Sequence, residues 1–295
     1  MIDSILALSK NANATGNEKE LLAAIEDEAK KHNLQCKYDA LGSLIVKISG
    51  TEKSQKNVFI SCTVDVYGFV CLAVDKDKCF LASTFNSDAK KLENRKLISE
   101  TKKTYKVSVD KNENIFVCSK SLKIGNFLKE QIQYKKKEHR IIGKFSAKYA
   151  LIHTLICMFK VRPKHDIIIY FAVQGESACC SQANAVYDLK PDFALLLGAT
   201  ESNAKAPLIV LKDGKIFSDP SLVKTAKSNK IKTSDYISDS KQSITKAESI
   251  LSHTGVPTLT LALPCNCLME ENEEFNIGTC EKLISLLQSL CTNKL

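Results

Sequence analysis

An apolar run near residue 60 passes directly into a short polar segment. The run Asn57 to Ile60 continues into Ser61-Cys62-Thr63-Val64-Asp65-Val66-Tyr67-Gly68-Phe69. A short, continuous apolar run predicts a strand that is buried on both faces of a sheet. In open α/β sheets, functional groups gather at the carboxyl ends of such strands. Thr63 to Asp65 is therefore the first place where a site is expected.

Helix-like and strand-like segments alternate through most of the chain. An amphipathic helix is expected at Glu18 to His32, and packed helices at Lys148 to Phe159, Ala178 to Asp188 and Phe275 to Cys291. The expected strands are Ser43 to Ile48, Asn57 to Cys62, His165 to Val173, Asp192 to Leu197 and Val256 to Leu263. Apolar strands between helices predict an α/β fold with a mixed, mostly parallel sheet that is flanked by helices.

The segment from Cys71 to Ile142 differs from the rest of the chain. Short β-like runs at 80–84, 105–109, 114–118 and 127–134 are separated by lysine-rich polar stretches. We expect a small inserted β domain at residues 71–142, and a main α/β domain formed by residues 1–70 and 143–295.

The composition is that of an ordinary globular chain of 295 residues, with 44% hydrophobic and 25% charged residues. No apolar run approaches the roughly 18 residues of a membrane span, and the first residues lack the basic region of a signal peptide. The twelve cysteines are scattered, often within apolar runs. This pattern is typical of reduced, buried thiols and predicts a cytoplasmic protein without a membrane contact.

The formal net charge of +9 is concentrated in one segment. Residues 86–144 hold sixteen Lys or Arg against seven Asp or Glu, a difference of nine that equals the excess of the whole chain. A solvated lysine-rich face is the simpler interpretation, and a docking surface for an acidic partner is the alternative. Aromatic residues are not interleaved with the basic ones, which disfavours nucleic acid as the partner.

Short motifs, in order along the chain, carry a resemblance to a known family. They are Asp39-Ala40-Leu41-Gly42-Ser43-Leu44, Asp65 with Gly68-Phe69, Leu122-Lys123-Ile124-Gly125-Asn126, Val173-Gln174-Gly175-Glu176, Pro191-Asp192 and Gly255-Val256-Pro257-Thr258. The set resembles the tetrahedral glutamyl aminopeptidases, two-metal exopeptidases of which some carry a cellulase label. The resemblance implies a metallo-aminopeptidase-like α/β domain with an inserted, small β-barrel-like domain that mediates subunit pairing.

The same resemblance implies that most metal ligands are missing. The family's two metal-binding His residues fall on Thr63 and Met269, its bridging Asp on Ala147 and a further metal-binding Asp on Gly198. Thr, Ala, Gly and Met do not hold Zn²⁺ or Co²⁺ as imidazole and carboxylate do. Lys148 would also add a positive charge beside the lost bridging position.

The general-base Glu of the family falls on Gly175, whereas Asp65 and the metal-binding Glu176 are retained. Each retained acid also has a structural interpretation, Glu176 as a carboxylate ahead of a helix and Asp65 as an acceptor for loop N–H groups. A weaker hypothesis is a vestigial cleft in which surviving acids and a thiol form a substitute site. Its members would be Asp65, Glu176, Glu201, Cys267 and Glu270.

The cysteines near the predicted site are ambiguous. Cys265-x-Cys267 has the chemistry of soft metal ligands, and Cys179-Cys180 lies in a loop that would approach it. The spacing is not C-x-x-C, so idle or buried thiols are the more frequent case.

The sequence as a whole favours a catalytically inactive, aminopeptidase-like protein that needs no cofactor. It would be a structural or regulatory subunit of a homo-oligomer, or of a hetero-oligomer with an active paralogue. One alternative is an active or weakly active aminopeptidase that uses two divalent ions, zinc or cobalt, to release N-terminal residues from short peptides. The other is a module that binds short peptides in the vacated cleft.

Overall fold

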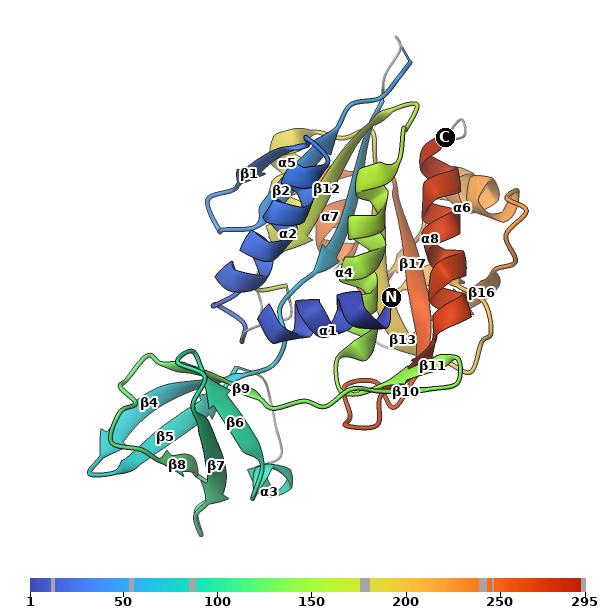
Figure 1. Ribbon diagram of the computed structural model, residues 1–295. Coiled ribbons are helices and arrows are strands. Elements are labelled where there is room, and N and C mark those ends of the chain that lie inside the picture. The colour runs from blue at the N-terminus through green and yellow to red at the C-terminus, as the bar shows by residue number, and fades with distance from the viewer. Residues whose placement is uncertain are drawn as a thin grey trace.

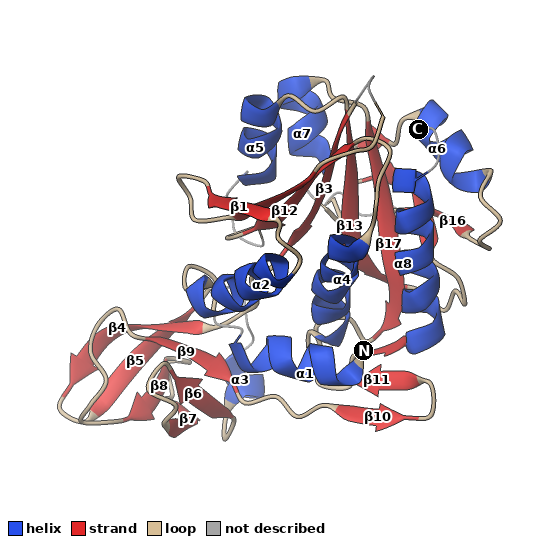
Figure 2. Ribbon diagram, turned by 45° about the horizontal axis from the view of Figure 1, so that its top comes forward, coloured by secondary structure: helices blue, strands red, loops and turns tan. Residues whose placement is uncertain are grey.

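The computed structural model describes residues 1–11, 14–52, 56–84, 89–175, 181–238, 243–245 and 247–292 (Figure 1). These residues form a large α/β unit and a smaller β-barrel that projects from one end of it (Figures 1 and 2). None of the helices in these ranges is long and apolar enough to cross a membrane.

The described strands of the α/β unit form one twelve-stranded sheet. Its main path is β1 (Gln35–Tyr38), β2 (Leu44–Ile48), β12 (Asp166–Ala172), β3 (Asn57–Thr63), β13 (Phe193–Glu201), β17 (Thr258–Asn266), β18 (Glu274–Asn276), β11 (Arg140–Ile142) and β10 (Lys135–Lys137). A branch from β17 holds β14 (Leu208–Asp213), β15 (Ile216–Phe217) and β16 (Ser234–Ile237). The four central strands, β12, β3, β13 and β17, are parallel, so their carboxyl ends meet at one edge.

Helices cover both faces of this sheet (Figure 2). One face carries α1 (Ile2–Asn11), α2 (Lys19–Lys31), α4 (Ser146–Cys157) with the 3₁₀ turn η1 (Met158–Lys160), α6 (Pro220–Lys227) and α8 (Ile277–Thr292). The other carries α5 (Ser181–Leu189) and α7 (Ala247–Thr254). Strand β3 packs Val58 and Ile60 toward the first layer and Phe59 toward the second. The strand is therefore buried on both faces, as its continuous apolar run predicts.

The barrel is closed and has its own core. Its strands, in order around the barrel, are β4 (Phe69–Asp75), β5 (Lys78–Ser83), β8 (Ile115–Cys118), β7 (Thr104–Val109), β6 (Lys96–Ser99) and β9 (Phe127–Glu130), with the short helix α3 (Ala89–Leu92) between β5 and β6. Phe69, Leu97, Val107, Val117 and Leu128 are buried inside it. The prediction of an α/β unit with a barrel-like insertion is confirmed at the level of the fold.

The sequence-based boundaries differ from the structure at several elements. The insertion was expected to end at residue 142, but the barrel strands end at Glu130, and the hairpin of β10 and β11 joins the main sheet through β18. The last helix begins at Ile277 rather than Phe275, because Phe275 pairs with Cys265 and Ile141 within the sheet.

Several elements of the main unit were not predicted. They include helices α1 and α7, strand β1, and the β14 to β16 branch with α6.

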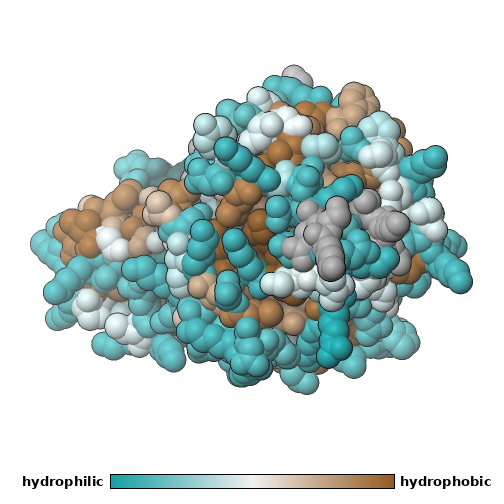
Figure 3. Space-filling model, turned by 90° about the horizontal axis from the view of Figure 1, so that it is seen from above, coloured by the Kyte–Doolittle hydropathy of each residue, from teal (hydrophilic) through white to brown (hydrophobic). Residues whose placement is uncertain are grey.

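Large apolar side chains reach the surface of the barrel. Leu72 and Val74 on β4 and Ile124 in the loop before β9 are exposed, Ile124 to 68%. Apolar atoms gather on the barrel lobe, at the left of Figure 3. Isolated exposed apolar residues are normal, but a group of them on one lobe is typical of a contact surface.

Candidate functional site

A cavity of about 600 Å³ lies at the carboxyl ends of the central parallel strands. Thr63 at the end of β3, Gly198 and Thr200 in β13, and Met269 beyond β17 line it, together with Lys148 from the first turn of α4. Three positions at which the family resemblance expects metal ligands, Thr63, Gly198 and Met269, thus share one cavity. The fourth, Ala147, is fully buried at the start of α4.

Thr63 and Lys148 make a direct contact in this cavity. The Lys148 ammonium donates a hydrogen bond to the Thr63 hydroxyl, with 2.7 Å between Nζ and Oγ1. The Thr63 methyl group faces Gly175, where an added Cβ would lie only 2.1 Å from it. The position of the expected general base therefore has no room for a side chain while Thr63 keeps this orientation.

Gly198 likewise has no room for a larger side chain. A Cβ at this position would lie 2.5 Å from Cγ2 of Ile244 and 2.8 Å from Cγ2 of Thr245. Both side chains also line the cavity. The space that a metal-binding Asp at position 198 would need is filled by a short segment, residues 243–245.

Glu273 is a buried carboxylate that connects the start of α4 to the Met269 loop, and the sequence analysis did not predict this role. It is 1% exposed and accepts four hydrogen bonds: from the N–H groups of Ala147 (2.7 Å), Met269 (2.7 Å) and Phe145 (3.3 Å), and from the Ser146 hydroxyl (3.3 Å). Burial raises the pKa of Glu273 against the lowering effect of these donors. A carboxylate here caps the N-terminus of α4, as expected from the helix dipole.

The same carboxylate holds two strained backbone positions. Phe145 and Met269 have φ angles of 62° and 67°, a region that non-glycine residues rarely occupy and that persists only where the surroundings impose it. The N–H groups of both residues donate to Glu273. Side-chain contacts connect the two loops as well, since Tyr67 packs edge-on against Phe145 at 5.3 Å and its hydroxyl contacts the Met269 sulfur at 2.6 Å.

Asp65 is completely buried and ties loops together. Its carboxylate accepts from the Thr15 hydroxyl (3.2 Å) and from the Gly175 N–H (3.1 Å). This geometry fits the structural interpretation of Asp65 as an acceptor for loop groups. The neighbouring Cys62 is also buried, and burial raises the pKa of its thiol to about 12, so it is protonated at neutral pH.

The described members of the predicted vestigial cleft do not line the cavity. The described residues that line the cavity do not include Asp65, Glu201, Cys267 or Glu270. Glu201 is exposed and accepts from the Leu268 N–H (3.2 Å), and Cys267 accepts from the Asn272 amide (3.3 Å). Glu176, Cys179 and Cys180 lie outside the described residues.

The thiols of the Cys265-x-Cys267 pair differ in environment. Cys265 is buried and its Sγ donates to the Thr200 carbonyl (3.5 Å), whereas Cys267 is half-buried in the loop beyond β17. The ten cysteines within the described ranges are all free thiols.

The described side chains that line this cavity do not fit a pair of divalent cations. Within the described part of the chain, no three His, Cys, Asp or Glu side chains gather in a group that could hold a metal. Hydroxyl, thioether and ammonium groups replace the imidazoles and carboxylates that Zn²⁺ or Co²⁺ require. The Lys148 ammonium adds a charge of the same sign as the metal ions.

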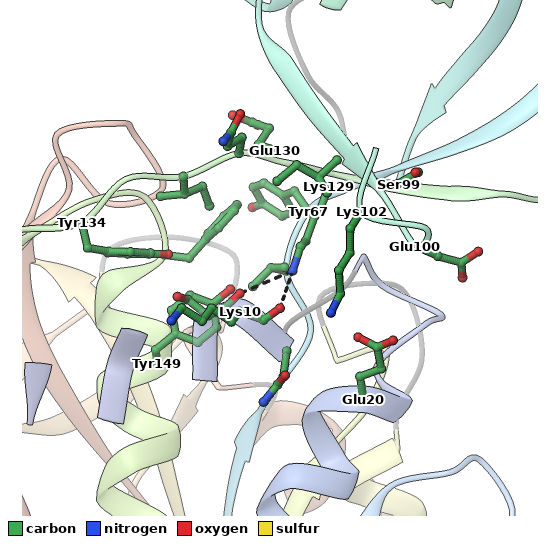
Figure 4. Close-up of a pocket in the computed structure, with 17 residues that line it drawn as sticks. Lys10, Glu20, Tyr67, Ser99, Glu100, Lys102, Lys129, Glu130, Tyr134 and Tyr149 are labelled. Carbon is green, nitrogen blue, oxygen red and sulfur yellow. Dashed lines mark hydrogen bonds between the residues drawn. The ribbon is translucent and has the colours of Figure 1, made fainter. Parts of the chain in front are cut away.

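A second cavity, of about 520 Å³, lies where the barrel meets the main unit (Figure 4). Lys129 of β9 reaches across it and donates to the carbonyl oxygens of Lys10 (3.0 Å) and Ser9 (3.5 Å) at the end of α1. Tyr67 and Phe145 line both cavities. An ion pair of Arg95 in the barrel with Glu271 also connects the barrel to the loop that carries Met269. The barrel therefore contacts the loop that forms one wall of the first cavity.

Comparisons with known proteins give a likeness in structure. No protein-family model matches the chain, and no curated protein matches its sequence. An aminopeptidase from the archaeon Desulfurococcus kamchatkensis superposes with a TM-score of 0.85 and 15% identity, over 99% of this chain and 95% of that chain. An endoglucanase from Thermotoga maritima superposes with a TM-score of 0.81 and 21% identity, over 98% of this chain and 96% of that chain.

A third similar structure is the TET1 peptidase of Pyrococcus horikoshii, which can assemble into a tetrahedron or a large octahedral shell. It superposes with a TM-score of 0.82 and 18% identity, over 99% of both chains. The TM-scores of 0.81 to 0.85 show a shared fold, and at identities of 15% to 21% the likeness shows the fold alone. The chain therefore has the fold of these three structures over nearly its whole length, and the resemblance expected from the ordered motifs is confirmed at that level.

Proposed function

We propose that this protein is a catalytically inactive member of the aminopeptidase fold, with a structural or regulatory role. The observation that carries the proposal is the close packing of side chains against two expected site positions, the general-base position 175 and the metal-ligand position 198. The Thr63 methyl group closes position 175, and Ile244 and Thr245 close position 198. A site that had only lost its ligands would leave room at these positions, whereas here the neighbouring side chains are packed against them.

The backbone conformation of the loops around the cavity supports the same proposal. Glu273 still holds Phe145 and Met269 in rare backbone conformations around the cavity. Such conformations cost about 1–3 kcal/mol each and are kept only where the structure over-determines them. We infer that the loops of the site serve shape and binding, and no longer the chemistry of peptide hydrolysis.

Metal content tests this proposal. Protein that is purified without chelator and dialysed against Zn²⁺, Co²⁺ or Mn²⁺ is expected to hold much less than one ion per chain in elemental analysis. The reason is that the described cavity wall lacks His and presents an ammonium group instead. About two tightly held ions per chain would contradict the proposal and would favour an active aminopeptidase with zinc or cobalt.

A peptide-binding module is the second candidate function. The cavity of about 600 Å³ favours it, because small-molecule sites commonly have volumes of about 300–1,000 Å³. Binding and inactivity are compatible, so the two candidates describe one protein that holds peptides without cleaving them.

We further propose that the barrel mediates assembly. Its exposed residues Leu72, Val74 and Ile124 supply apolar contact area. The segment 86–144, which includes much of the barrel and the adjoining β10–β11 hairpin of the main sheet, carries an excess of nine positive charges. Two such surfaces repel each other, whereas an acidic relative is attracted. We therefore propose an oligomer that pairs with a more acidic, active relative in preference to a second copy of itself.

Light scattering after size exclusion tests the assembly proposal. Mixed oligomers with the acidic relative are expected at low salt, with weaker association at high salt because exposed charges are screened. Leu72→Asp combined with Val74→Asp is expected to abolish assembly, whereas Tyr187→Asp, a change at an exposed apolar residue of α5, is the control. A monomer under every condition, alone or mixed, would refute the proposal.

A further inference from the structure

The sheet of the main unit ends in a strand that consists of three lysines. Among the described strands, β10 (Lys135–Lys137) is the last on the main path of the sheet, and it pairs with β11 on one side. A two-residue turn, Glu138-His139, joins these two strands. Figure 2 shows both strands at one edge of the main unit. Within the described chain, the other side of β10 is an open edge.

The backbone groups of Lys136 point toward this open edge. The His139 carbonyl accepts a hydrogen bond from the Ile277 N–H at 2.8 Å, on the β18 side of β11. Successive residues of a strand bond to opposite neighbours, so the backbone groups of Ile141 also face β18. Lys136 is the residue opposite Ile141. Its own N–H and C=O therefore face away from β11.

Nearby acids do not balance the charge of this hairpin. Residues 135–142 hold four Lys or Arg and one Glu, an excess of three positive charges, and the chain around them is described without a gap over 89–175 and 247–292. Three acids beside the hairpin already have basic partners: Glu130 with Lys144, Glu271 with Arg95, and Glu274 with Arg140. Among the described ion pairs, none involves a lysine of β10, and all three lysines are exposed.

The segment ahead of β10 lengthens this surface. It crosses from the barrel to the main unit (Figure 1), and Gln131 and Gln133 are exposed, whereas Ile132 and Tyr134 are half-buried. Such alternation is typical of an extended chain with one face turned inward. Both glutamines and Lys135 line a cavity of about 380 Å³. A chain laid along residues 131–137 would thus meet amide groups and then ammonium groups.

We infer that β10 is a docking strand for an extended, acidic segment of a partner protein. The segment would add to the sheet through the outward N–H and C=O of Lys136 and place its carboxylates against the lysines. A second copy of this chain fits poorly, because pairing of two β10 strands brings lysine opposite lysine. Nucleic acid is disfavoured, since β10 offers no aromatic side chain on which bases could stack. The inference rests on the proposed assembly with an acidic relative and names the strand at which that partner would bind.

Fluorescence anisotropy with a labelled peptide tests the inference on the full chain. The peptide Glu-Thr-Glu-Val-Glu-Thr-Glu is expected to bind, and its counterpart with Lys in place of Glu is not. Raising the salt concentration from about 50 mM to about 500 mM is expected to weaken binding at least about tenfold, because exposed charges are screened.

Two charge-reversal variants test the role of the lysines. Lys135→Glu combined with Lys137→Glu is expected to weaken peptide binding at least about tenfold. Lys205→Glu combined with Lys224→Glu makes the same change in net charge at exposed residues elsewhere on the main unit. This control is expected to change the dissociation constant less than about twofold, since distant charges are screened.

Two variants at position 136 separate backbone pairing from charge. Lys136→Thr removes the ammonium and keeps the N–H, whereas Lys136→Pro removes both. Proline is tolerated on an edge strand where the N–H faces solvent. The proline variant is expected to bind the peptide at least about fivefold more weakly than the threonine variant, because a backbone hydrogen bond is lost.

The outcomes distinguish this inference from the assembly proposal. No binding of the acidic peptide, or equal binding by the threonine and proline variants, would overturn the docking strand. A single-stranded DNA oligonucleotide that displaces the labelled peptide as well as unlabelled peptide does would also overturn it, in favour of a general polyanion surface. Mixed oligomers without peptide binding would refute this inference alone, whereas peptide binding without mixed oligomers would refute the assembly proposal alone.

Discussion

Glu273→Ala is expected to lower the free energy of unfolding by about 3 kcal/mol or more, which is a large share of the stability of an ordinary domain. The change leaves three N–H groups and one hydroxyl without their acceptor at the start of α4 and in the Met269 loop. It also removes the group that holds Phe145 and Met269 at positive φ. Chemical denaturation followed by circular dichroism measures the effect.

Glu270→Ala is the matched control, since Glu270 is an exposed carboxylate in the same loop. This substitution is expected to change the free energy of unfolding by no more than about 0.5 kcal/mol. Equal, small effects of the two substitutions would show that Glu273 does not organise the site.

Glu273→Gln separates charge from shape. Because burial raises the pKa of Glu273, the native state binds its proton more tightly than the unfolded state does. This group therefore makes the wild type less stable as pH rises from the unfolded value near 4.5 through the native value. The glutamine variant lacks that dependence, so its stability deficit is expected to shrink over the same interval.

Gly198→Asp is expected to destabilise the fold by about 3 kcal/mol and to bind no metal, although it restores an acid at an expected ligand position. The new Cβ would overlap Ile244 and Thr245, and the carboxylate would enter a space that these side chains fill. Thermal and denaturant unfolding measure the stability, and elemental analysis measures the metal.

A double-mutant cycle isolates the steric part of this effect. Gly198→Ala adds only the Cβ, and its cost is expected to fall by at least about 1 kcal/mol in an Ile244→Ala background, because neighbouring residues couple. If the losses in unfolding free energy were additive, or if Gly198→Asp were as stable as the wild type, position 198 would have room for a side chain. Either result would contradict the proposal that neighbouring side chains fill this part of the site.

The sequence predicted the frame of the fold because its signals there are strong and local. The continuous apolar runs of β3, β12, β13 and β17 can be buried only in a two-sided sheet. The hairpin of β10 and β11 was assigned to the insertion because its lysines resemble those of the barrel, and only pairing with β18 shows where it belongs. The β14 to β16 branch has short strands whose partners are distant in sequence.

The site was predictable only in part. Thr63 was expected from the end of a strand, and Gly198 and Met269 from the family resemblance. The structure brings the three positions to one cavity. Glu273 was missed because it stands in the run Glu270-Glu271-Asn272-Glu273-Glu274, where no local signal tells which carboxylate turns inward. The closure of Gly175 and Gly198 depends on side-chain packing between distant segments, which a sequence pattern does not encode.

Release of free amino acids from short peptides is the measurement that tests the central claim most directly. The account predicts no release above the protein-free blank, with or without added Co²⁺ or Zn²⁺, because position 175 has no side chain to act as a general base and such a group contributes about 10²–10⁴ in rate. Clear turnover that appears with Co²⁺ and disappears in Glu176→Ala would contradict the account and would assign a working two-metal peptidase site to this protein.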